Sequence, residues 1–568
     1  MINIDIRKSE NCNGKASLFM TFPYDETVIN LIRSFPNRFW DTKQKAWEVP
    51  YKELPVILEE LPTYTFDITV SDPKLLEASK PIDVANIIDN FKFKTSPYQH
   101  QIDGVIYGLQ HDKWLLGDSM GLGKSKQSID IAVAKKSQYG YKHCLVICGV
   151  NGLKWNWVNE VATHSDEHSW ILGQKQRGNH TVIGSNADKV ADIKALKDGE
   201  LEDKYFIITN IESLRDEDIV KGLSELCDNN TINMIIADEC HMMKNPSSQQ
   251  GKGFLKLKAD SMIAMTGTPL LNTPLDLYII LKWLGYENHT FYSFRNHYCK
   301  MGGFGGYQIV GYQHLNELQA KLDEMMLRRK KEDVLDLPEK TYINEYVEMS
   351  DKQRIIYNEI SSEIKMNIDQ IKMASNPLAE LIRMRQATGY TGILSSSIKV
   401  SAKLDRMEEL VEDSVSDGKK VVIFSNWTQM TDAIYERLNK NYKGIAVITG
   451  QTKDADRQNL INKFQNDEDC NIMIGTIGAL GTGVTLSSAS VVIFVDHPWT
   501  RGVYDQAVDR LHRIGQTSNI LIYNLLCKNT IDEKILAIIN KKGAMSDMIV
   551  DNMTPTDKSV LIDFLLDD

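Results

Sequence analysis

The sequence predicts an α/β protein with two tandem lobes, each built on a parallel sheet, and a small α+β module in front of them. Two series of short apolar runs alternate with helical patterns, which indicates parallel sheets covered by helices on both faces. The first 90 residues show a shorter, separate pattern in the order strand, helix, strand, helix: Ala16 to Phe22, Glu26 to Phe35, Lys45 to Val49, and Glu53 to Leu61. A chain of 568 residues is also too long for a single core.

These patterns divide the chain into four expected segments. The boundaries follow breaks between the series of runs and a proline-containing stretch around Pro73 and Pro81. We expect a small N-terminal module, a first lobe with the nucleotide-binding features, a second lobe of similar build, and a short tail: residues 1–90, 91–345, 346–545 and 546–568.

Composition excludes several classes of protein. Hydrophobic residues make up 42% and charged residues 25%, and no stretch has the 18 or more apolar residues of a membrane span. The polar N-terminus, MINIDIRKSE, lacks a signal-like apolar region. We therefore expect a cytoplasmic monomer without a membrane partner.

Cysteine usage and net charge bound the cofactors and partners further. The eight cysteines form no CxxC pair or zinc-like cluster, and Cys144 and Cys148 lie in an apolar run where buried thiols are expected. The net charge of −11 argues weakly against a polyanionic partner. It does not exclude one, because a local basic groove can bind phosphates on an acidic protein.

The glycine-rich stretch GDSMGLGKSKQS, residues 117–128, follows an apolar run and opens a helix. Such a turn directs backbone N–H groups and a helix N-terminus at one place, which suits a triphosphate. Lys124 would reach the β- and γ-phosphates, and the Ser125 hydroxyl would bind Mg²⁺. The alternative is an ordinary strand-to-helix turn, since Asp118 stands where the strict phosphate-loop pattern has glycine. The expected ATP-binding residues here are Asp118, Met120, Gly121, Leu122, Gly123, Lys124 and Ser125.

Adjacent carboxylates follow a later apolar run in IIADECH. A carboxylate at the end of a buried strand needs a partner to stay charged, so Asp238 is expected to hold Mg²⁺. Glu239 would orient or deprotonate the attacking water, and His241 would link that carboxylate to Thr266. A cap or turn is the plainer alternative for an isolated Asp-Glu pair.

The apolar runs place these residues at one edge of a sheet. In open parallel sheets, ligands bind beyond the carboxyl ends of the strands. The phosphate loop, the Asp-Glu pair and Thr266 to Pro269 each follow one such run. The runs of the first lobe are Trp114 to Leu116, Cys144 to Ile147, Phe206 to Ile208, Met234 to Ala237, and Met262 to Met265.

The second series of runs has no phosphate loop, but a polar helix-like segment follows its fourth run. Gln506, Arg510 and Arg513 are spaced to share one helical face. Arginines so placed suit a γ-phosphate held by the other lobe. The alternative is a surface helix with Asp509 as salt-bridge partner. The runs are Val421 to Phe424, Ile445 to Ile448, Ile472 to Ile474, Val491 to Val495, and Ile520 to Tyr523.

Five motifs of the first lobe together resemble the Swi/Snf family, superfamily 2 ATPases that translocate on DNA. They are Gln99, DSMGLGKS, LKWNWVNE, DECH and TGTPLLN, and the second lobe adds QAVDRLHRIGQ. The family carries Glu at the position of Ser119 and Ala at that of Cys240. The resemblance implies two RecA-like lobes that close on ATP and Mg²⁺. It assigns Gln99 to the adenine, with Gln101 as the less favoured alternative, Gly481 to the nucleotide, and Lys124, Glu239, Gln506, Arg510 and Arg513 to catalysis.

The resemblance also implies where DNA lies and what a further segment does. DNA phosphates would cross both lobes opposite the nucleotide. The implied contacts are Lys154, Trp155, Asn426, Trp427 and Thr476. The run MLRRKKEDVLDLPEK, residues 326–340, corresponds to a segment that packs near the cleft between the lobes in these translocases. The alternative for its four consecutive basic residues is a solvated face.

The N-terminal module resembles the HARP domain that precedes the motor in annealing helicases. The similarity covers about forty residues and rests on an aromatic set comprising Phe22, Tyr24, Phe39, Trp40 and Trp47. The alternative is that these aromatics form the core of a small domain or a protein-docking platform. Lys43 and Lys45, beside Trp47, are the candidates for nucleic-acid contact.

The expected function is ATP-driven movement along double-stranded DNA, with fork remodelling or strand annealing as its more specific form. Alternatives are a superfamily 2 helicase that separates DNA or RNA strands, or a remodeller that displaces a protein such as RNA polymerase from DNA. An inactive DNA-binding scaffold is disfavoured by the intact Lys124, Asp238 and Glu239. The compact length fits a bacterial or viral source better than a nuclear one.

Overall fold

The computed structural model describes most of the chain and contains two compact units, residues 1–91 and 92–568. Each unit is considered by itself. The described residues are 1–9, 16–35, 38–71, 88, 90–149, 153–177, 180–243, 245–267, 273–302, 308–367, 379–395, 397–480 and 484–540. Pro73, Pro81, the end of the TGTP motif, Gly481 and the tail from residue 541 lie outside them.

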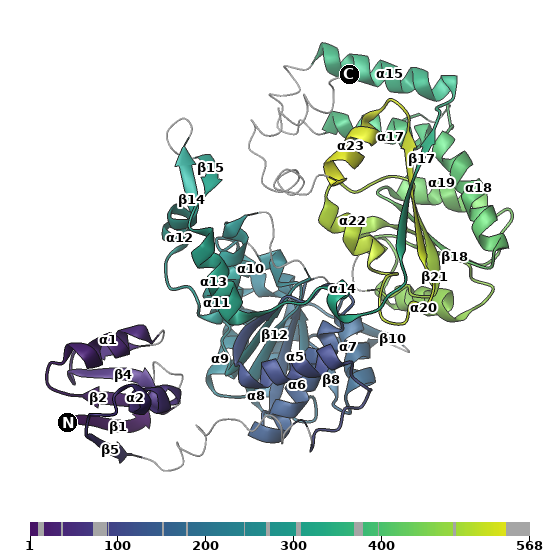
Figure 1. Ribbon diagram of the computed structural model, residues 1–568. Helices are drawn as coiled ribbons and strands as arrows, with labels where there is room; N and C mark the ends of the chain where they lie inside the picture. Colours follow the sequence, from purple (N-terminus) through teal and green to yellow (C-terminus); the bar gives the residue numbers. More distant parts are fainter. Residues whose placement is uncertain are drawn as a thin grey trace. The chain divides into compact units, whose positions relative to one another are not determined.

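The N-terminal unit is a five-stranded mixed sheet with two helices, coloured purple in Figure 1. The strand order is β3-β4-β2-β1-β5, and only the β1–β5 pair is parallel. Its elements are β1 (Ile2–Lys8), β2 (Ala16–Thr21), α1 (Glu26–Ser34), β3 (Phe39–Asp41), β4 (Ala46–Pro50), α2 (Leu54–Glu60) and β5 (Phe66–Val70).

Alternation of apolar residues explains the sheet of this unit. Ile2, Ile4 and Ile6 on β1 are buried and pack against Val28 and Ile32 of α1 in a single core. The α1 helix begins where the Asp25 side chain accepts hydrogen bonds from two backbone N–H groups of the first turn. The predicted β2, α1, β4 and α2 are present, whereas β1, β3 and β5 were not predicted.

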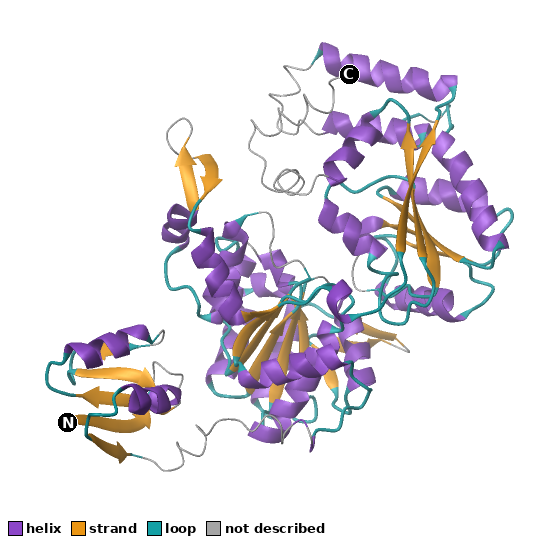
Figure 2. Ribbon diagram, viewed as in Figure 1, coloured by secondary structure: helices purple, strands orange, loops and turns teal. Residues whose placement is uncertain are grey.

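The first lobe has a seven-stranded, fully parallel sheet in the order β16-β6-β13-β12-β7-β11-β8. All five apolar runs expected in this lobe are strands. Figure 2 shows helices on both sides of the sheet. The strands are β6 (Lys113–Leu116), β7 (His143–Cys148), β8 (Ser169–Ile171), β11 (Phe206–Asn210), β12 (Ile232–Ala237), β13 (Ser261–Met265) and β16 (Met326–Leu327).

Ten helices belong to this lobe within the described ranges, together with the hairpins β9 (Gln174–Arg177)–β10 (His180–Ile183) and β14 (Cys299–Gly302)–β15 (Gln308–Tyr312). The helices are α5 (Gln99–Gln110), α6 (Lys124–Tyr139), α7 (Leu153–His164), α8 (Asn186–Lys197), α9 (Glu217–Asp228), α10 (Gln249–Lys256), α11 (Tyr278–Leu284), α12 (Phe291–Tyr298), α13 (Leu315–Met325) and α14 (Lys331–Val334).

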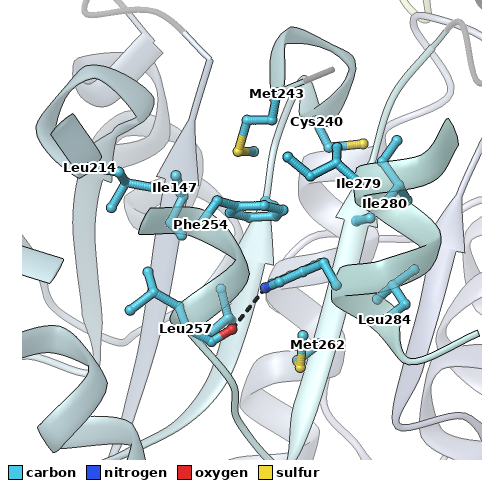
Figure 3. Packing of buried hydrophobic residues seen from close by; sticks show 14 of the residues in the cluster. Ile147, Leu214, Cys240, Met243, Phe254, Leu257, Met262, Ile279, Ile280 and Leu284 are labelled. Carbon is cyan, nitrogen blue, oxygen red and sulfur yellow. Dashed lines mark hydrogen bonds between the residues drawn. The ribbon is translucent and has the colours of Figure 1, made fainter. Parts of the chain in front are cut away.

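The core on one face of this sheet is centred on Phe254 of α10 (Figure 3). Its ring stacks on Trp283 of α11 with centroids 4.4 Å apart, and the Trp283 indole N–H donates to the Leu257 carbonyl at 2.8 Å. Figure 3 also shows Cys240 beside Ile279 in this core. The departure from alanine at position 240 thus supplies a small apolar side chain to the packing.

The second lobe has a six-stranded parallel sheet in the order β17-β22-β21-β18-β20-β19. All five expected runs are strands here too. The predicted boundary after residue 345 falls inside β17, and since all eight residues of β17 pair with β22, the sheet of the second lobe begins at Lys340. The strands are β17 (Lys340–Val347), β18 (Lys420–Ser425), β19 (Ile445–Ile448), β20 (Ile472–Thr476), β21 (Ala489–Phe494) and β22 (Ile520–Cys527).

Successive residues of β18 enter separate cores on the two faces of this sheet. Val421 and Ile423 pack with α18 and α19, while Val422 and Phe424 pack with the remaining large helices. The helices are α15 (Asp351–Met366), α17 (Ala379–Gly389), α18 (Ala402–Ser416), α19 (Thr428–Leu438), α20 (Asp454–Asn466), α21 (Ile477–Leu480), α22 (Arg501–Val508) and α23 (Ile531–Asn540).

The predicted fold class is confirmed: two parallel sheets of RecA-like lobes and a small mixed-sheet module. Cys144 and Cys148 are buried thiols, as expected. Among the described residues, no helix has both the length and the apolar composition needed to cross a membrane.

Replacing Phe254 by alanine is expected to lower the free energy of unfolding by about 3–5 kcal/mol, because the fully buried ring leaves a cavity against Trp283. The matched control is Tyr292→Ala, an exposed aromatic of the same lobe, with an expected change within about 0.5 kcal/mol. Thermal and urea unfolding of the full chain measure both. Equal unfolding midpoints for the two variants would contradict this packing.

Candidate active site

The turn between β6 and α6 has the backbone geometry of a phosphate loop. Gly121 and Gly123 have φ of +85° and +76°, a region that favours glycine. Gly123 is the residue before α6, and a Cβ there would lie 2.3 Å from Nε2 of Gln101. The sequence therefore needs glycine here both for the turn and for the close approach of α5.

Lys124 begins α6 and turns its ammonium back to the loop. Its Nζ donates to the carbonyls of Asp118 at 2.9 Å and Ser119 at 3.4 Å. Burial lowers the pKa of Lys124, and the nearby carboxylates of Glu239, Asp118 and Asp238 oppose that shift. Ser125 follows on the same turn, with its side chain partly exposed.

Asp238 and Glu239 lie just past the carboxyl end of β12. Asp238 accepts hydrogen bonds from the Trp157 indole at 3.0 Å and from the Glu239 backbone N–H at 2.9 Å. Burial, followed by the charge of Glu239, raises the pKa of Asp238. Glu239 has φ of +49°, a strained conformation for this residue type that is typical of functional sites.

Burial alone would raise the pKa of Glu239, but His241 and the positive charges of Lys124 and Arg510 outweigh it and lower that pKa. Nδ1 of His241 lies 3.2 Å from the Glu239 carboxylate and 3.1 Å from the Thr266 hydroxyl. The structure thus brings together the three side chains that the sequence predicts to be linked.

Nε of Arg510 is buried without a hydrogen-bonding partner among the described residues. Oε2 of Glu239 is also buried, and the His241 ring nitrogen lies 3.2 Å from it. Because a carboxylate oxygen can accept more than one hydrogen bond and buried polar groups are almost always satisfied, both side chains have hydrogen-bonding capacity for a ligand. A carboxylate accepts from an attacking water and a guanidinium donates to phosphate oxygens, so the two atoms fit a nucleotide triphosphate.

The prediction that Asp118 binds the nucleotide is wrong in its detail. The Asp118 side chain is fully buried and forms an ion pair with Arg329, whose Nε donates to Oδ1 at 3.0 Å. Gln127 and the Arg329 backbone N–H donate to the same carboxylate. The Asp118 side chain therefore fixes the loop to residue 329, whereas its backbone carbonyl accepts a hydrogen bond from Lys124.

Gln99 is also misplaced as the adenine-reading residue. Its side chain is exposed and donates to Asp103 at 2.9 Å. Gln101, the less favoured candidate, is 3% exposed and donates to the Leu122 carbonyl of the phosphate loop at 3.3 Å. The two glutamines are two positions apart on α5, so only one of them can face the loop.

The two arginines of the second lobe reach the phosphate loop, but from a turn and not from a helical face. The α22 helix ends at Val508, with Asp509 as its C-cap. Arg510 is 4% exposed, and its Nη2 lies 3.9 Å from Sδ of Met120. Burial, followed by the charge of Arg513, lowers the pKa of Arg510.

Arg513 packs on the phosphate loop. A Cβ on Gly121 would lie 3.1 Å from Cγ of Arg513. Its Nη1 donates to Thr485 and its Nε to the Asp509 carbonyl. Gln506, the third predicted residue, lies partly buried on α22, one turn before Arg510.

Of the two residues predicted to contact DNA in the first lobe, one is buried and the other is partly exposed. Lys154 is 4% exposed, so it is not a surface cation. Trp155 is partly exposed on the first turn of α7. Trp157, two positions later, is buried and donates its indole N–H to Asp238, so this helix orients the Asp238 carboxylate.

In the second lobe, the predicted DNA-contacting residues Asn426 and Trp427 make contacts within the lobe. The Asn426 side-chain amide donates to Asp496 and to the His497 carbonyl at 2.7 Å. Trp427 packs on the core, with the Arg385 guanidinium 5.2 Å above its ring. Thr476 ends β20 with a partly exposed side chain, so it stays available for a ligand.

Three residues that orient the site were not predicted from the sequence: Trp157, Gln127 and Arg329. Trp157 and Arg329 lie in the runs LKWNWVNE and MLRRKKEDVLDLPEK, so family-specific motifs had marked them without giving their roles. Gln127 had no signal beyond its position on the first turns of α6.

One further cluster has metal-binding residue types, namely His297, His314 and Glu317. Their ligand atoms lie within 4.8 Å of one another on an exposed surface. The imidazole rings are stacked, 13° from parallel with centroids 4.5 Å apart, whereas a shared metal must lie in the plane of both rings. The cluster is therefore a hydrogen-bonded surface contact in this conformation.

The chain matches the SNF2-related domain over residues 98–393, which is more than half of its length, and the helicase conserved C-terminal domain over residues 402–515. The chain belongs to the SNF2-related family. It is accordingly an ATP hydrolase of superfamily 2, and the loop, the carboxylates and the arginines described above are found in its two ATPase lobes.

Several curated relatives of this SNF2-family ATPase are similar over most of its length. One is the Caenorhabditis elegans homolog of SWI/SNF-related matrix-associated actin-dependent regulator of chromatin subfamily A-like protein 1, 27% identical over 92% of this chain and 73% of that protein. Another is the Bos taurus DNA annealing helicase and endonuclease ZRANB3, 28% identical over 83% of this chain and 42% of that protein.

A solved structure, the Sulfolobus solfataricus SWI2/SNF2 ATPase core in complex with dsDNA, is 25% identical and covers 84% of this chain and 98% of its own, with a TM-score of 0.38. The chain spans 73% of the nematode relative but about half or less of other relatives, such as the Xenopus laevis and Bos taurus proteins.

Glu239→Gln is expected to reduce ATP hydrolysis at least about a hundredfold, because the amide cannot accept the proton of the attacking water. ATP binding should persist, since the phosphate loop and Lys124 are unchanged. Lys124→Ala should lose hydrolysis and weaken nucleotide binding as well. A coupled phosphate-release assay and fluorescent-nucleotide titration measure the two properties. Hydrolysis at the wild-type rate in either variant would remove these residues from the mechanism.

Proposed function

We propose that this protein is an ATP-dependent translocase on double-stranded DNA. The observation that carries the proposal is the approach of buried Arg510 from the second lobe to the phosphate loop and Glu239 of the first. A nucleotide bound there touches both lobes, so hydrolysis changes how the lobes are held together. Such nucleotide-dependent closure is a common means of converting hydrolysis into motion.

The roles of the side chains follow from their positions. Lys124 and the loop N–H groups bind the β- and γ-phosphates, and Glu239 orients the attacking water. Ser125 and Asp238 are the proposed Mg²⁺ ligands, since one offers a hydroxyl at the start of α6 and the other a carboxylate at the end of β12. Mg²⁺ would neutralise charge on the phosphate oxygens.

Arg510 and Arg513 supply positive charge from the second lobe. Arginine stays protonated even where burial lowers its pKa, so Arg510 keeps its charge at physiological pH. Guanidinium groups that reach a transferring phosphoryl group raise its transfer rate by about a thousandfold or more. The partly buried Gln506 is proposed to contact the nucleotide or its water from α22.

DNA as the track is supported by the relatives. ZRANB3 is described as a DNA annealing helicase, and the solved Sulfolobus core is bound to duplex DNA. In this chain Trp155 of the first lobe and Thr476 of the second remain the proposed contacts to the DNA phosphate backbone, because their side chains are partly exposed. Contacts to the phosphate backbone carry no sequence information, so sequence-independent binding is expected.

The N-terminal unit supports a more specific activity, strand annealing. Its β3–β4 hairpin pairs Trp40 with Trp47 at 5.1 Å between ring centroids, and Trp40 is 47% exposed. Lys43 and Lys45 are exposed at the hairpin turn. Exposed aromatic rings beside cations suit single-stranded nucleic acid, whose bases stack on the rings while its phosphates meet the charges.

Purified protein is expected to hydrolyse ATP several-fold faster with duplex or forked DNA than without it, because DNA bridging the lobes favours closure. The stimulation should weaken as salt rises, since phosphate contacts release counterions. ATPase assays across duplex, fork, junction, single-stranded DNA and RNA measure this. Equal rates with and without every nucleic acid would refute translocation, and stimulation by RNA alone would favour an RNA helicase.

The variant Trp40→Ala is expected to reduce annealing of complementary strands at least about fivefold, because one stacked base is worth about 1–3 kcal/mol. ATPase activity without DNA should stay unchanged, since residue 40 lies in the separate N-terminal unit. Val56→Ala, another exposed apolar residue of this unit, is the matched control. Equal annealing by the two variants would indicate that the hairpin does not bind nucleic acid.

A further inference from the structure

The segment that connects the two lobes, residues 326–340, also contacts both halves of the active site. It leaves the first lobe as β16, which pairs with β6 directly before the phosphate loop. It then forms the short helix α14 and enters the second lobe as β17. We call residues 326–340 the connecting segment.

The first anchor of the connecting segment is the back of the phosphate loop. Beyond β16 the pairing continues, because Gly117 N–H donates to the Leu327 carbonyl at 2.8 Å and Ser119 N–H to the Arg329 carbonyl at 3.0 Å. The Arg329 guanidinium binds the fully buried Asp118 carboxylate and donates to Gln127 at 2.7 Å. Residues 327–329 are thereby fixed to the loop by both backbone and side chains.

The second anchor lies two residues further on and belongs to the other lobe. Nζ of Lys331 donates to the Asp509 carboxylate at 2.7 Å and to the His512 carbonyl at 2.8 Å. Both side chains of the ion pair are largely buried, with 11% and 19% of their surface exposed. Ion pairs with little solvent contact are screened much less than surface pairs.

The turn that Lys331 holds is the one that presents the arginines. Asp509 directly precedes Arg510, and its carbonyl accepts the Nε hydrogen bond of Arg513 at 2.8 Å. His512, whose carbonyl binds Lys331, directly precedes Arg513. A second contact, between His512 Nε2 and the Pro338 carbonyl at 2.9 Å, holds the turn to the same connecting segment.

The basic run therefore does not act as a uniform solvated face. Lys330 points to solvent with 64% of its side chain exposed, and its Nζ forms only a long ion pair, 3.9 Å from Oε1 of Glu332. Arg329 and Lys331, on either side of it, point to opposite lobes. The backbone at Lys330 is extended, and neighbouring side chains in an extended segment alternate in direction, so Lys330 faces solvent while Arg329 and Lys331 both face inward.

We propose that Lys331 is a positioning residue for ATP hydrolysis: it fixes the Asp509–Arg513 turn against the phosphate loop so that Arg510 and Arg513 face the γ-phosphate. Lys331 can fix the turn in this position because the Arg329–Asp118 ion pair holds the backbone just before Lys331 to the phosphate loop. Lys331 binds the Asp509 carboxylate and the His512 carbonyl, so it acts through the turn that carries the two arginines.

The proposal has a specific kinetic signature. The first lobe supplies the phosphate loop that binds the nucleotide, and those contacts do not involve Lys331. Loss of Lys331 should therefore lower kcat much more than it changes KM for ATP, because both arginines remain present and charged but are less precisely placed, and contacts made in the transition state depend most on exact position. Lys331→Arg keeps a charged donor and should restore most of the rate.

The test compares Lys331→Met, Lys331→Arg and the matched control Lys330→Met in the full chain. The expected result is a fall in kcat of about tenfold or more for Lys331→Met, with KM within about twofold, and less than about threefold for Lys331→Arg. Lys330→Met should behave as wild type. Unchanged kcat in Lys331→Met, or equal losses in Lys331→Met and Lys331→Arg, would overturn the proposal.

A double-mutant cycle with Asp509→Asn identifies the partner. If Lys331 acts through Asp509, the double variant should be no slower than the worse single variant. If the double variant instead loses the product of the two single rate losses, Lys331 acts independently of Asp509. If the melting temperature of Lys331→Met falls together with its kcat, the role of Lys331 is merely structural. All rates are measured with and without duplex DNA, so failure of DNA stimulation, which tests the proposed function, is separate from failure of this proposal.

Discussion

The structure depends most on a group of buried charges that come from both lobes. Lys124, Asp238 and Glu239 meet at the carboxyl edge of the first sheet, and Arg510 reaches them from the second lobe. Removing charges from water is costly unless each finds a partner. The strained backbone of Glu239, and the buried Nε of Arg510 that has no hydrogen-bonding partner among the described residues, indicate a site with capacity for a ligand.

Parallel-sheet architecture explains how such a group is assembled. Strands β6, β12 and β13 run in the same direction and lie together in the sheet, so the phosphate loop, the Asp-Glu pair and Thr266 emerge at one edge. A second lobe built on the same principle then adds the arginine turn. The connecting segment joins the two edges by short-range contacts, from Arg329 to Asp118 and from Lys331 to Asp509. Nucleotide binding and lobe geometry are thus linked through a few residues.

The sequence predicted the buried strands and the ends that carry chemistry, but not the partners of individual side chains. Fully apolar runs such as His143–Cys148 are clear because both faces of a parallel strand are covered. The strand Lys340–Val347 was missed because it is an edge strand with mostly exposed residues. Asp118 was misjudged because its partner, Arg329, is distant in sequence, and Gln99 because two glutamines shared one motif while helical geometry selects only Gln101.

The most direct measurement of the central claim is the affinity for ATP relative to ADP, with and without Arg510. It is made in the Glu239→Gln background, so that ATP is not consumed. Two lobes that share one nucleotide predict that Arg510→Ala weakens ATP binding several-fold and leaves ADP binding unchanged, because only the γ-phosphate reaches the second lobe. An unaltered ratio of the two affinities would contradict the account.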